Sequence, residues 1–114
     1  MTAHEAAHQW WGNILSAAEG PGTGHLVEGM AHFSALLLAE EMRGAEGRAA
    51  LSKSMETSYL RRRHPGSEKP VAKMVDDQEP QDWTVVYEKG AWVMWMLQEP
   101  VSYTHLTLPT IYSV

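Results

Sequence analysis

The chain contains no cysteine, few basic residues and no long apolar run. The absence of cysteine excludes disulfide bonds and thiol catalysis, although it leaves the redox compartment open. Nine Lys and Arg against fourteen Asp and Glu give a formal net charge of −5. This balance argues against a nucleic-acid partner, because neutralising phosphates requires clustered cations. The sequence shows no signal peptide and no approach to the roughly 20 apolar residues that cross a bilayer.

What the chain does contain is sufficient for one small helical unit. Its 114 residues correspond to a single domain, and apolar residues make up 44% of them, with five Trp and seven Met. Gly44 and Pro65 interrupt the helical periodicity, and the polar stretch 66–83 is expected to be a loop. The predicted fold is therefore all-α, with helices over residues 2–15, 25–42, 45–63 and 87–98.

Apolar residues recur at helical spacing in the second and third of these segments. They are expected to form the core-facing stripes: Leu26, Met30, Phe33 and Leu37 in the second, and Leu51, Met55 and Tyr59 in the third.

His4 and His8 lie four residues apart in the first expected helix, with Glu5 between them. Residues four apart share a helix face, so the two imidazoles lie side by side as a tetrahedral zinc ion requires. Glu5 is rotated about 100° from His4, which places it near such an ion without making it a ligand. A carboxylate there is suited to act as the general base. The same H-E-x-x-H pattern arises by chance in roughly three of a hundred such sequences.

A catalytic zinc site needs a third protein ligand, for which Glu28 is the candidate. A carboxylate on an otherwise apolar helix is costly to bury without a partner, and a zinc ion would supply one. A solvated glutamate in the first turn, favoured by the helix dipole, explains the residue equally well. His25 and His32 are also within range as ligands, although most histidines on helices have no metal.

Tyr87 precedes the first turn of the fourth expected helix, in the stretch VVYEKGAW. A phenol donor directed at a developing oxyanion would stabilise a tetrahedral transition state. Taken alone, a tyrosine at a helix start is more often a packing residue. The catalytic interpretation depends on the zinc motif.

Three blocks together, HEAAHQWWGN, LVEGMAHFSAL and YEKGAWV, resemble the aminopeptidase-N-like family of zinc metallopeptidases, one of the gluzincins. The resemblance covers about residues 3–99. It implies that His4, His8 and Glu28 are the ligands of one Zn²⁺ ion, that Glu5 is the general base and that Tyr87 is the transition-state tyrosine.

The implied activity is hydrolysis of the N-terminal peptide bond of peptides with a free N-terminus. The implied fold is a helical fragment of a thermolysin-like zinc peptidase catalytic domain. Two alternatives stay open. The first is a non-catalytic peptidase-like binding or scaffold domain of a membrane transporter permease, and the second is a thermolysin-type endopeptidase, which the YEKG block disfavours.

The chain departs from the family pattern in its spacing and its extent. Nineteen residues separate His8 from Glu28, one more than is common, and the loop AEGPGTG can absorb the insertion. The upstream Gly-x-Met-x-Asn exopeptidase motif and the C-terminal helical domain have no counterpart here. The stretch EGMAHFSALLLAEE is most similar to a bacterial branch fused to permease segments, which would make the parent protein membrane-associated. Localisation is otherwise open.

The two ends of the chain are expected to be unusual. The tail VSYTHLTLPTIYSV resembles a translated sequencing adapter, so residues 1–99 are assigned to a partial catalytic domain and residues 100–114 to a non-native tail. Met1 is interpreted as an internal methionine of a longer parent protein. The isolated chain is therefore expected to be poorly folded or inactive, because so small a piece buries a limited fraction of its surface.

Overall fold

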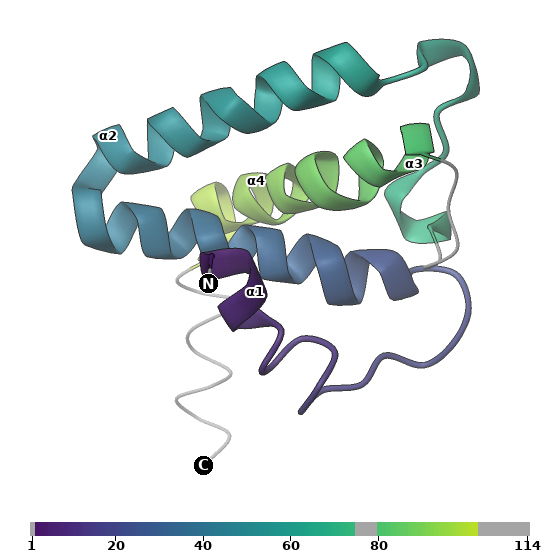
Figure 1. Cartoon of the computed structure of the whole chain (residues 1–114), viewed down its shortest axis with the longest axis horizontal. Helices are drawn as coiled ribbons and strands as arrows, with labels where there is room; N and C mark the ends of the chain where they lie inside the picture. Colours follow the sequence, from purple (N-terminus) through teal and green to yellow (C-terminus); the bar gives the residue numbers. More distant parts are fainter. Residues whose placement is uncertain (1, 75–79, 103–114) are drawn as a thin grey trace.

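A computed structural model describes residues 2–74 and 80–102 of the chain. Within these residues no strand is formed, and an isolated bridge between Trp11 and Leu15 is the only β pairing, so the all-α prediction is confirmed. Figure 1 shows the arrangement of the elements. In chain order they are α1 (Ala3–Ala7), the π-helix η1 (His25–Gly29), α2 (Met30–Arg62), the 3₁₀ turns η2 (Pro65–Ser67) and η3 (Val71–Lys73), α3 (Pro80–Thr84), the π-helix η4 (Val85–Lys89) and α4 (Gly90–Ser102).

Helix α2 is folded back on itself at Gly44. This residue has φ 67° and ψ −159°, a conformation that glycine adopts at little cost because it lacks a Cβ. The two arms of α2 run in opposite directions, and α4 packs against them (Figure 1). The prediction that Gly44 separates two helices is thus confirmed.

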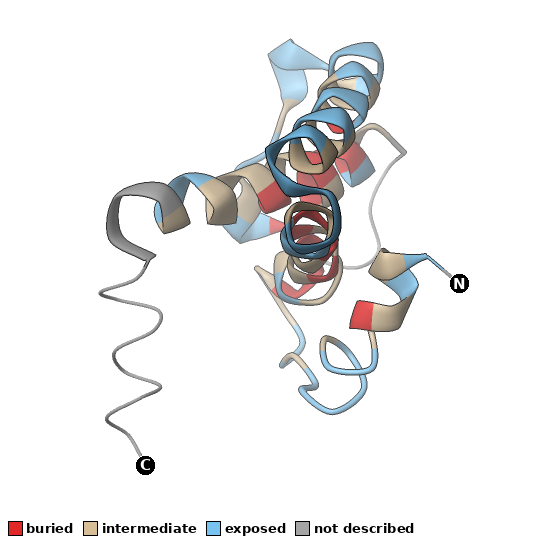
Figure 2. Cartoon of the chain, turned by 90° about the vertical axis from the view of Figure 1, so that its left-hand side faces the viewer, coloured by how far each residue is buried: buried red, intermediate tan, exposed pale blue. Residues whose placement is uncertain are grey.

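The main core lies where the arms of α2 meet α4, and α1 sits at its edge (Figure 2). Phe33 and Trp95 make an edge-to-face contact there, with ring centroids 6.5 Å apart, and the Arg48 guanidinium covers Trp95. The buried members of this cluster are Phe33, Leu36, Met55 and Ala91.

The expected apolar stripes were partly right. Met30, Phe33, Leu51 and Met55 lie in or against the main core, and the ring of Tyr59 packs edge-to-face on Trp92. Leu26 and Leu37, however, are 51% and 37% exposed. The buried face continues from Phe33 to Leu36 rather than to Leu37, and Leu26 lies in the wider turn of η1, which shifts it off the stripe.

A second, smaller cluster holds η4 in place. Met74, Val85 and Val86 are buried together, and Val71 and Tyr87 pack against them. The carbonyl oxygen of Met74 also accepts the N–H of Gly22 at 2.8 Å, which connects the glycine-rich loop before η1 to the end of the segment that follows η3. This cluster therefore supports η4, the turn that carries Tyr87.

Three helix boundaries differ from the sequence prediction. The first helix ends at Ala7 rather than at residue 15, because residues 8–15 form turns and Gly12 has φ 107°. The loop expected to reach Trp83 ends at Pro80, where α3 begins. The last helix continues two residues past Pro100, to Ser102.

No helix among the residues that the structure describes has the length and apolar character needed to span a bilayer. The tail hypothesis concerns residues 100–114, of which 103–114 lie outside the described residues. It stays a prediction that the codons of the coding sequence would test.

Candidate metal centre

Two π-helical turns carry the side chains that converge on one site. Glu28 lies in η1 and Tyr87 in η4, and both turns run directly into the long helices α2 and α4. Such π-turns occur mostly as single-turn bulges in α-helices, and they are frequent at functional sites. The two turns pack against each other closely because Gly29 and Gly90 meet at their interface: a Cβ on Gly90 would lie 3.5 Å from the Cα of Gly29.

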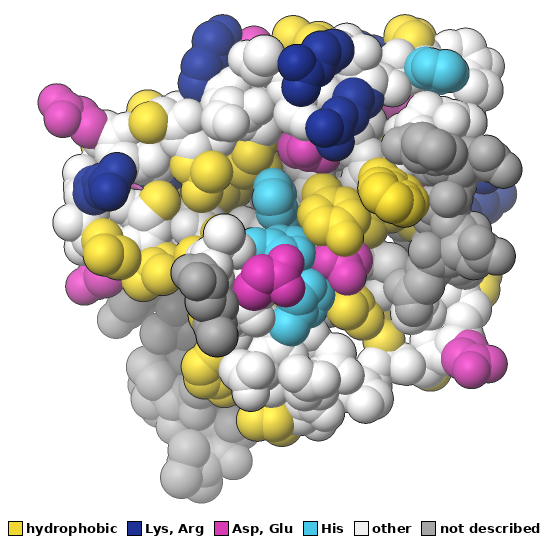
Figure 3. Space-filling view, viewed as in Figure 1, with side chains coloured by type: hydrophobic (Ala, Val, Ile, Leu, Met, Phe, Trp, Pro, Cys, Tyr) yellow, Lys and Arg dark blue, Asp and Glu magenta, His cyan; other side chains and the backbone are white. Residues whose placement is uncertain are grey.

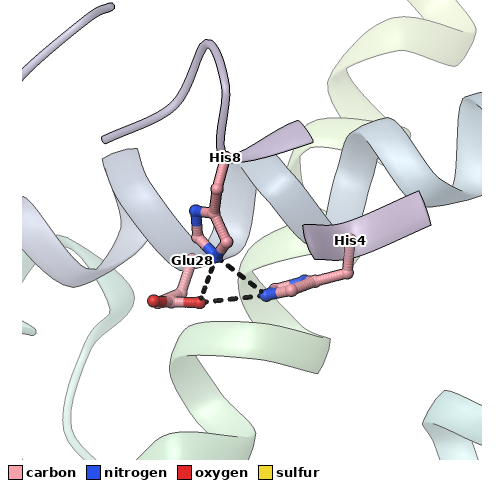
Figure 4. Close-up of side chains that lie close together, drawn as sticks. All are labelled: His4, His8 and Glu28. Carbon is pink, nitrogen blue, oxygen red and sulfur yellow. Dashed lines mark hydrogen bonds and ion pairs between the residues drawn. The ribbon is translucent and has the colours of Figure 1, made fainter. Parts of the chain in front are cut away.

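The histidines come from the short helix α1 and its C-terminal end. Thr2 caps this helix, and its Oγ1 accepts the backbone N–H of Glu5 at 3.3 Å. His4 lies within the helix and His8 is its C-cap, one turn further on. Both rings therefore project from the same face of α1, toward η1 (Figure 4).

Three side-chain atoms form a nearly equilateral triangle (Figure 4). Nε2 of His4 lies 3.1 Å from Oε2 of Glu28, and Nε2 of His8 lies 3.2 Å from the same oxygen. The two Nε2 atoms are 3.1 Å apart. The three side chains are 14%, 21% and 26% exposed for His4, His8 and Glu28, so the triangle is sheltered but reachable from solvent.

The donor set fits a zinc ion. Zinc bonds of about 2.0–2.1 Å at tetrahedral angles separate two ligand atoms by about 3.3 Å, close to the edges of the triangle. Nδ1 of His8 lies 2.9 Å from the carbonyl oxygen of Trp11, which can only accept, so this nitrogen carries the proton of a neutral ring. Nε2 of His8 then directs a lone pair at the Glu28 carboxylate. Acceptors that converge in this way require a cation or a shared proton between them.

The electrostatics of the site favour a charged Glu28 carboxylate and an uncharged His32 ring. A hydrogen bond from His4 lowers the pKa of Glu28 below its ordinary value, and Tyr87 and the charges of both histidines act in the same direction, against the effect of burial. Burial lowers the pKa of His32 to about 4, so its ring is uncharged at neutral pH. Burial also raises the pKa of Tyr87, and the neighbouring carboxylate of Glu28 adds to this effect, so its phenol remains a proton donor.

Tyr87 lies beside the triangle, and Glu5 follows the residue His4 in α1. The ring of Tyr87 stacks on His4 with centroids 5.3 Å apart. The Glu5 side chain is exposed, and its charge contributes to the raised pKa of Tyr87, which places the two groups in one electrostatic environment. In the space-filling view, histidine and acidic side chains gather at the centre of one face, with hydrophobic side chains next to them (Figure 3).

The other two histidines considered as ligands occupy different positions. His25 is not part of the triangle: its buried Nδ1 packs against Gly29 and Gly90 and has no hydrogen-bond partner among the described residues. His32 touches His4 from behind, with the two Nδ1 atoms 3.0 Å apart. The sequence analysis predicted neither the contact between His4 and His32 nor the contact between His8 and the carbonyl oxygen of Trp11. The spacing of four residues between Glu28 and His32, which puts them on one helix face, was the available signal for the contact of His32.

Among the described residues, His4, His8 and Glu28 are the one group of three side chains whose ligand atoms lie close enough together to hold a metal ion. Two histidines from one helix and a carboxylate from the next define the class of site that metal-dependent hydrolases use. Residues 1–108 match the peptidase family M1 domain, and the chain therefore belongs to peptidase family M1. It has a peptidase domain of the metallopeptidase class. No curated protein and no solved structure matches the chain.

Proposed function

We propose that this domain is a zinc metallo-aminopeptidase that holds one Zn²⁺ ion on His4, His8 and Glu28. The observation that carries the proposal is the triangle of ligand atoms with edges of 3.1–3.2 Å. The tautomer of His8 and the charged carboxylate of Glu28 suit a divalent cation that prefers nitrogen and oxygen ligands. Membership of peptidase family M1 supports a peptide as the substrate.

The residues of the chain have distinct proposed roles in the reaction. When bound, zinc supplies a Lewis acid for the scissile carbonyl and brings the pKa of its water ligand to about 7. The Glu5 carboxylate takes a proton from the attacking water and passes it to the leaving amine. The Tyr87 phenol, which stays protonated, donates a hydrogen bond to the oxyanion that develops on the substrate carbonyl.

The proposed substrate is a peptide with a free N-terminus. This preference follows from the resemblance of the YEKGAWV block to aminopeptidases, since no residue described here is assigned to binding the free amine. An internal peptide bond is the alternative target, and it would be cleaved by the same metal and base.

The proposal is tested with metal-free and zinc-reconstituted full-length protein. An aminoacyl reporter with a free amine should be hydrolysed only after one equivalent of zinc is added, whereas its N-acetylated form should not be. His4→Ala should abolish both zinc binding and turnover, and His64→Ala, which removes an exposed histidine outside the triangle, should change neither. Cleavage of the blocked substrate alone would indicate an endopeptidase. Zinc binding without cleavage of either substrate would favour a binding or scaffold domain.

A further inference from the structure

The contact between His4 and His32 links the metal triangle to helix α2. Nδ1 of His4 lies 3.0 Å from Nδ1 of His32, and the two rings are nearly perpendicular, with centroids 5.1 Å apart. We propose that His32 is a positioning residue, which fixes the tautomer and orientation of His4 so that its Nε2 can bind the metal. This inference rests on the proposed zinc site.

The direction of the hydrogen bond follows from proton counting. A ligating imidazole has its lone pair at the metal-facing nitrogen, so a neutral His4 that binds through Nε2 carries its one proton on Nδ1. Two facing Nδ1 atoms share one proton between them. The proton of His4 Nδ1 is therefore donated to His32, whose own proton is then on Nε2.

His8 offers a parallel within the same site. Its Nδ1 donates to the carbonyl of Trp11 at 2.9 Å, which leaves Nε2 facing Glu28. Metal-binding histidines usually donate their second nitrogen to such an acceptor, and the acceptor sets the ring orientation and the basicity of the ligand. With His32 as the acceptor for His4, both histidine ligands are held in this way.

His32 is well placed to be rigid. It lies one turn after Glu28, near the start of α2, so the helix that carries the third ligand also carries this acceptor. Its ring also meets Tyr87 edge-to-face, with centroids 5.7 Å apart. His32 contacts Nδ1 of His4, whereas Nε2 of His4 is the atom in the triangle. The geometry therefore assigns His32 an orienting role rather than that of a fourth ligand.

Two polar substitutions of His32 distinguish the position of its hydrogen-bond acceptor from the mere presence of a polar side chain. The amide of His32→Asn can place an acceptor near the position of the His32 Nδ1 atom, whereas His32→Gln places its amide one bond further away. We expect zinc affinity, measured by competition with a chelator, to fall about 10–100-fold in His32→Gln and to stay within about threefold of the unsubstituted chain in His32→Asn. The absorption bands of the cobalt-substituted protein should shift only in His32→Gln.

The outcomes distinguish this inference from the proposed function. Equal affinities in all three proteins, or equal losses in both variants, would overturn the role of His32 while leaving the zinc site intact. Failure of the unsubstituted full chain to bind one zinc ion would overturn the proposed function itself. Circular dichroism shows whether each variant is folded as the unsubstituted chain is. His64→Gln is the control for the loss of an exposed imidazole.

Discussion

The imidazole of His4 and the phenol ring of Tyr87 are stacked, with centroids 5.3 Å apart and planes inclined by 19°. His4 comes from α1 and Tyr87 from η4, so the stack joins the first helix of the chain to the turn that precedes α4. It brings a neutral phenol beside the ring that we propose as a zinc ligand. The proposed oxyanion donor therefore lies directly against a proposed metal ligand.

Tyr87→Phe should retain this stack and remove only the hydroxyl group. We expect kcat of the zinc-loaded protein to fall about 10²–10³-fold, the typical cost of losing one oxyanion donor, while one zinc ion is still bound. The matched control is Tyr59→Phe, because the Tyr59 hydroxyl donates to Glu68 away from the triangle. Steady-state kinetics and a zinc titration measure both effects. Unaltered kcat in Tyr87→Phe would contradict the proposed role.

Glu5→Gln should separate metal binding from catalysis. The amide is nearly the same size as the carboxylate but cannot accept a proton from water, so kcat should fall by about 10²–10⁴-fold or more. Zinc should remain bound, because Glu5 is not part of the triangle. Glu19→Gln, an exposed glutamate in the loop before η1, is the control. Turnover that survives in Glu5→Gln would remove this residue from the mechanism.

Zinc affinity should decrease as the pH is lowered from about 8 to about 5, since protons compete with the metal for imidazole nitrogens. The pKa of Glu28 lies below its ordinary value, with the hydrogen bond from His4 as the main cause, so its carboxylate stays charged over this range. Competition with a chelator at several pH values measures the decrease. An affinity that stays constant from about pH 8 to about pH 5 would contradict binding through imidazole nitrogens.

Gly29→Ala should destabilise the fold. A Cβ at this position would lie 2.7 Å from Nδ1 of His25 and 3.0 Å from the carbonyl oxygen of Val86, so η1 and η4 would have to separate. Overpacking of this kind costs about 1–3 kcal/mol, which exceeds the gain in helix propensity of up to about 1 kcal/mol. Gly66→Ala, where nothing lies within 4 Å, should change stability little. Urea unfolding compares the two, and equal midpoints would contradict the close packing.

Glu68 should make stability depend on pH. Its carboxylate pairs with Lys89 and Arg63 and accepts the hydroxyl of Tyr59 at 2.8 Å. The hydrogen bond from Lys89 is the main reason that its pKa is lowered. A lowered pKa in the folded state means that the stabilisation is present above the unfolded value of about 4.3 and is lost as the pH falls through the folded value.

Glu68→Gln should therefore lower the free energy of unfolding at pH 7 and flatten its decline in acid. The exposed Glu41, changed to Gln, should leave the pH profile as it is. Chemical denaturation at several pH values measures these slopes. If Glu68→Gln kept the slope of the unsubstituted chain, the carboxylate would not be the group that titrates.

Part of the fold and of the site could be read from the sequence. Gly44 was expected to interrupt the long helical stretch because it is the residue that most readily takes a positive φ, and it does so. The spacing of His4 and His8 defined a pair of imidazoles on one helix face, and Glu28 and Tyr87 were singled out through the blocks that resemble zinc peptidases. The end of α1 at Ala7 was missed, because the chain turns there to bring Trp11 back to the ring of His8.

The sequence by itself determined the helical class and the types of residue available for a metal, since periodicity, helix breakers and the four-residue spacing are local properties. Only the tertiary structure decided that Glu28 closes a triangle with two histidines, that His25 lies away from it and that His32 stands behind His4. These relationships depend on how closely η1, η4 and α1 approach one another. The packing around two glycines and two π-turns sets that approach, and no local pattern encodes it.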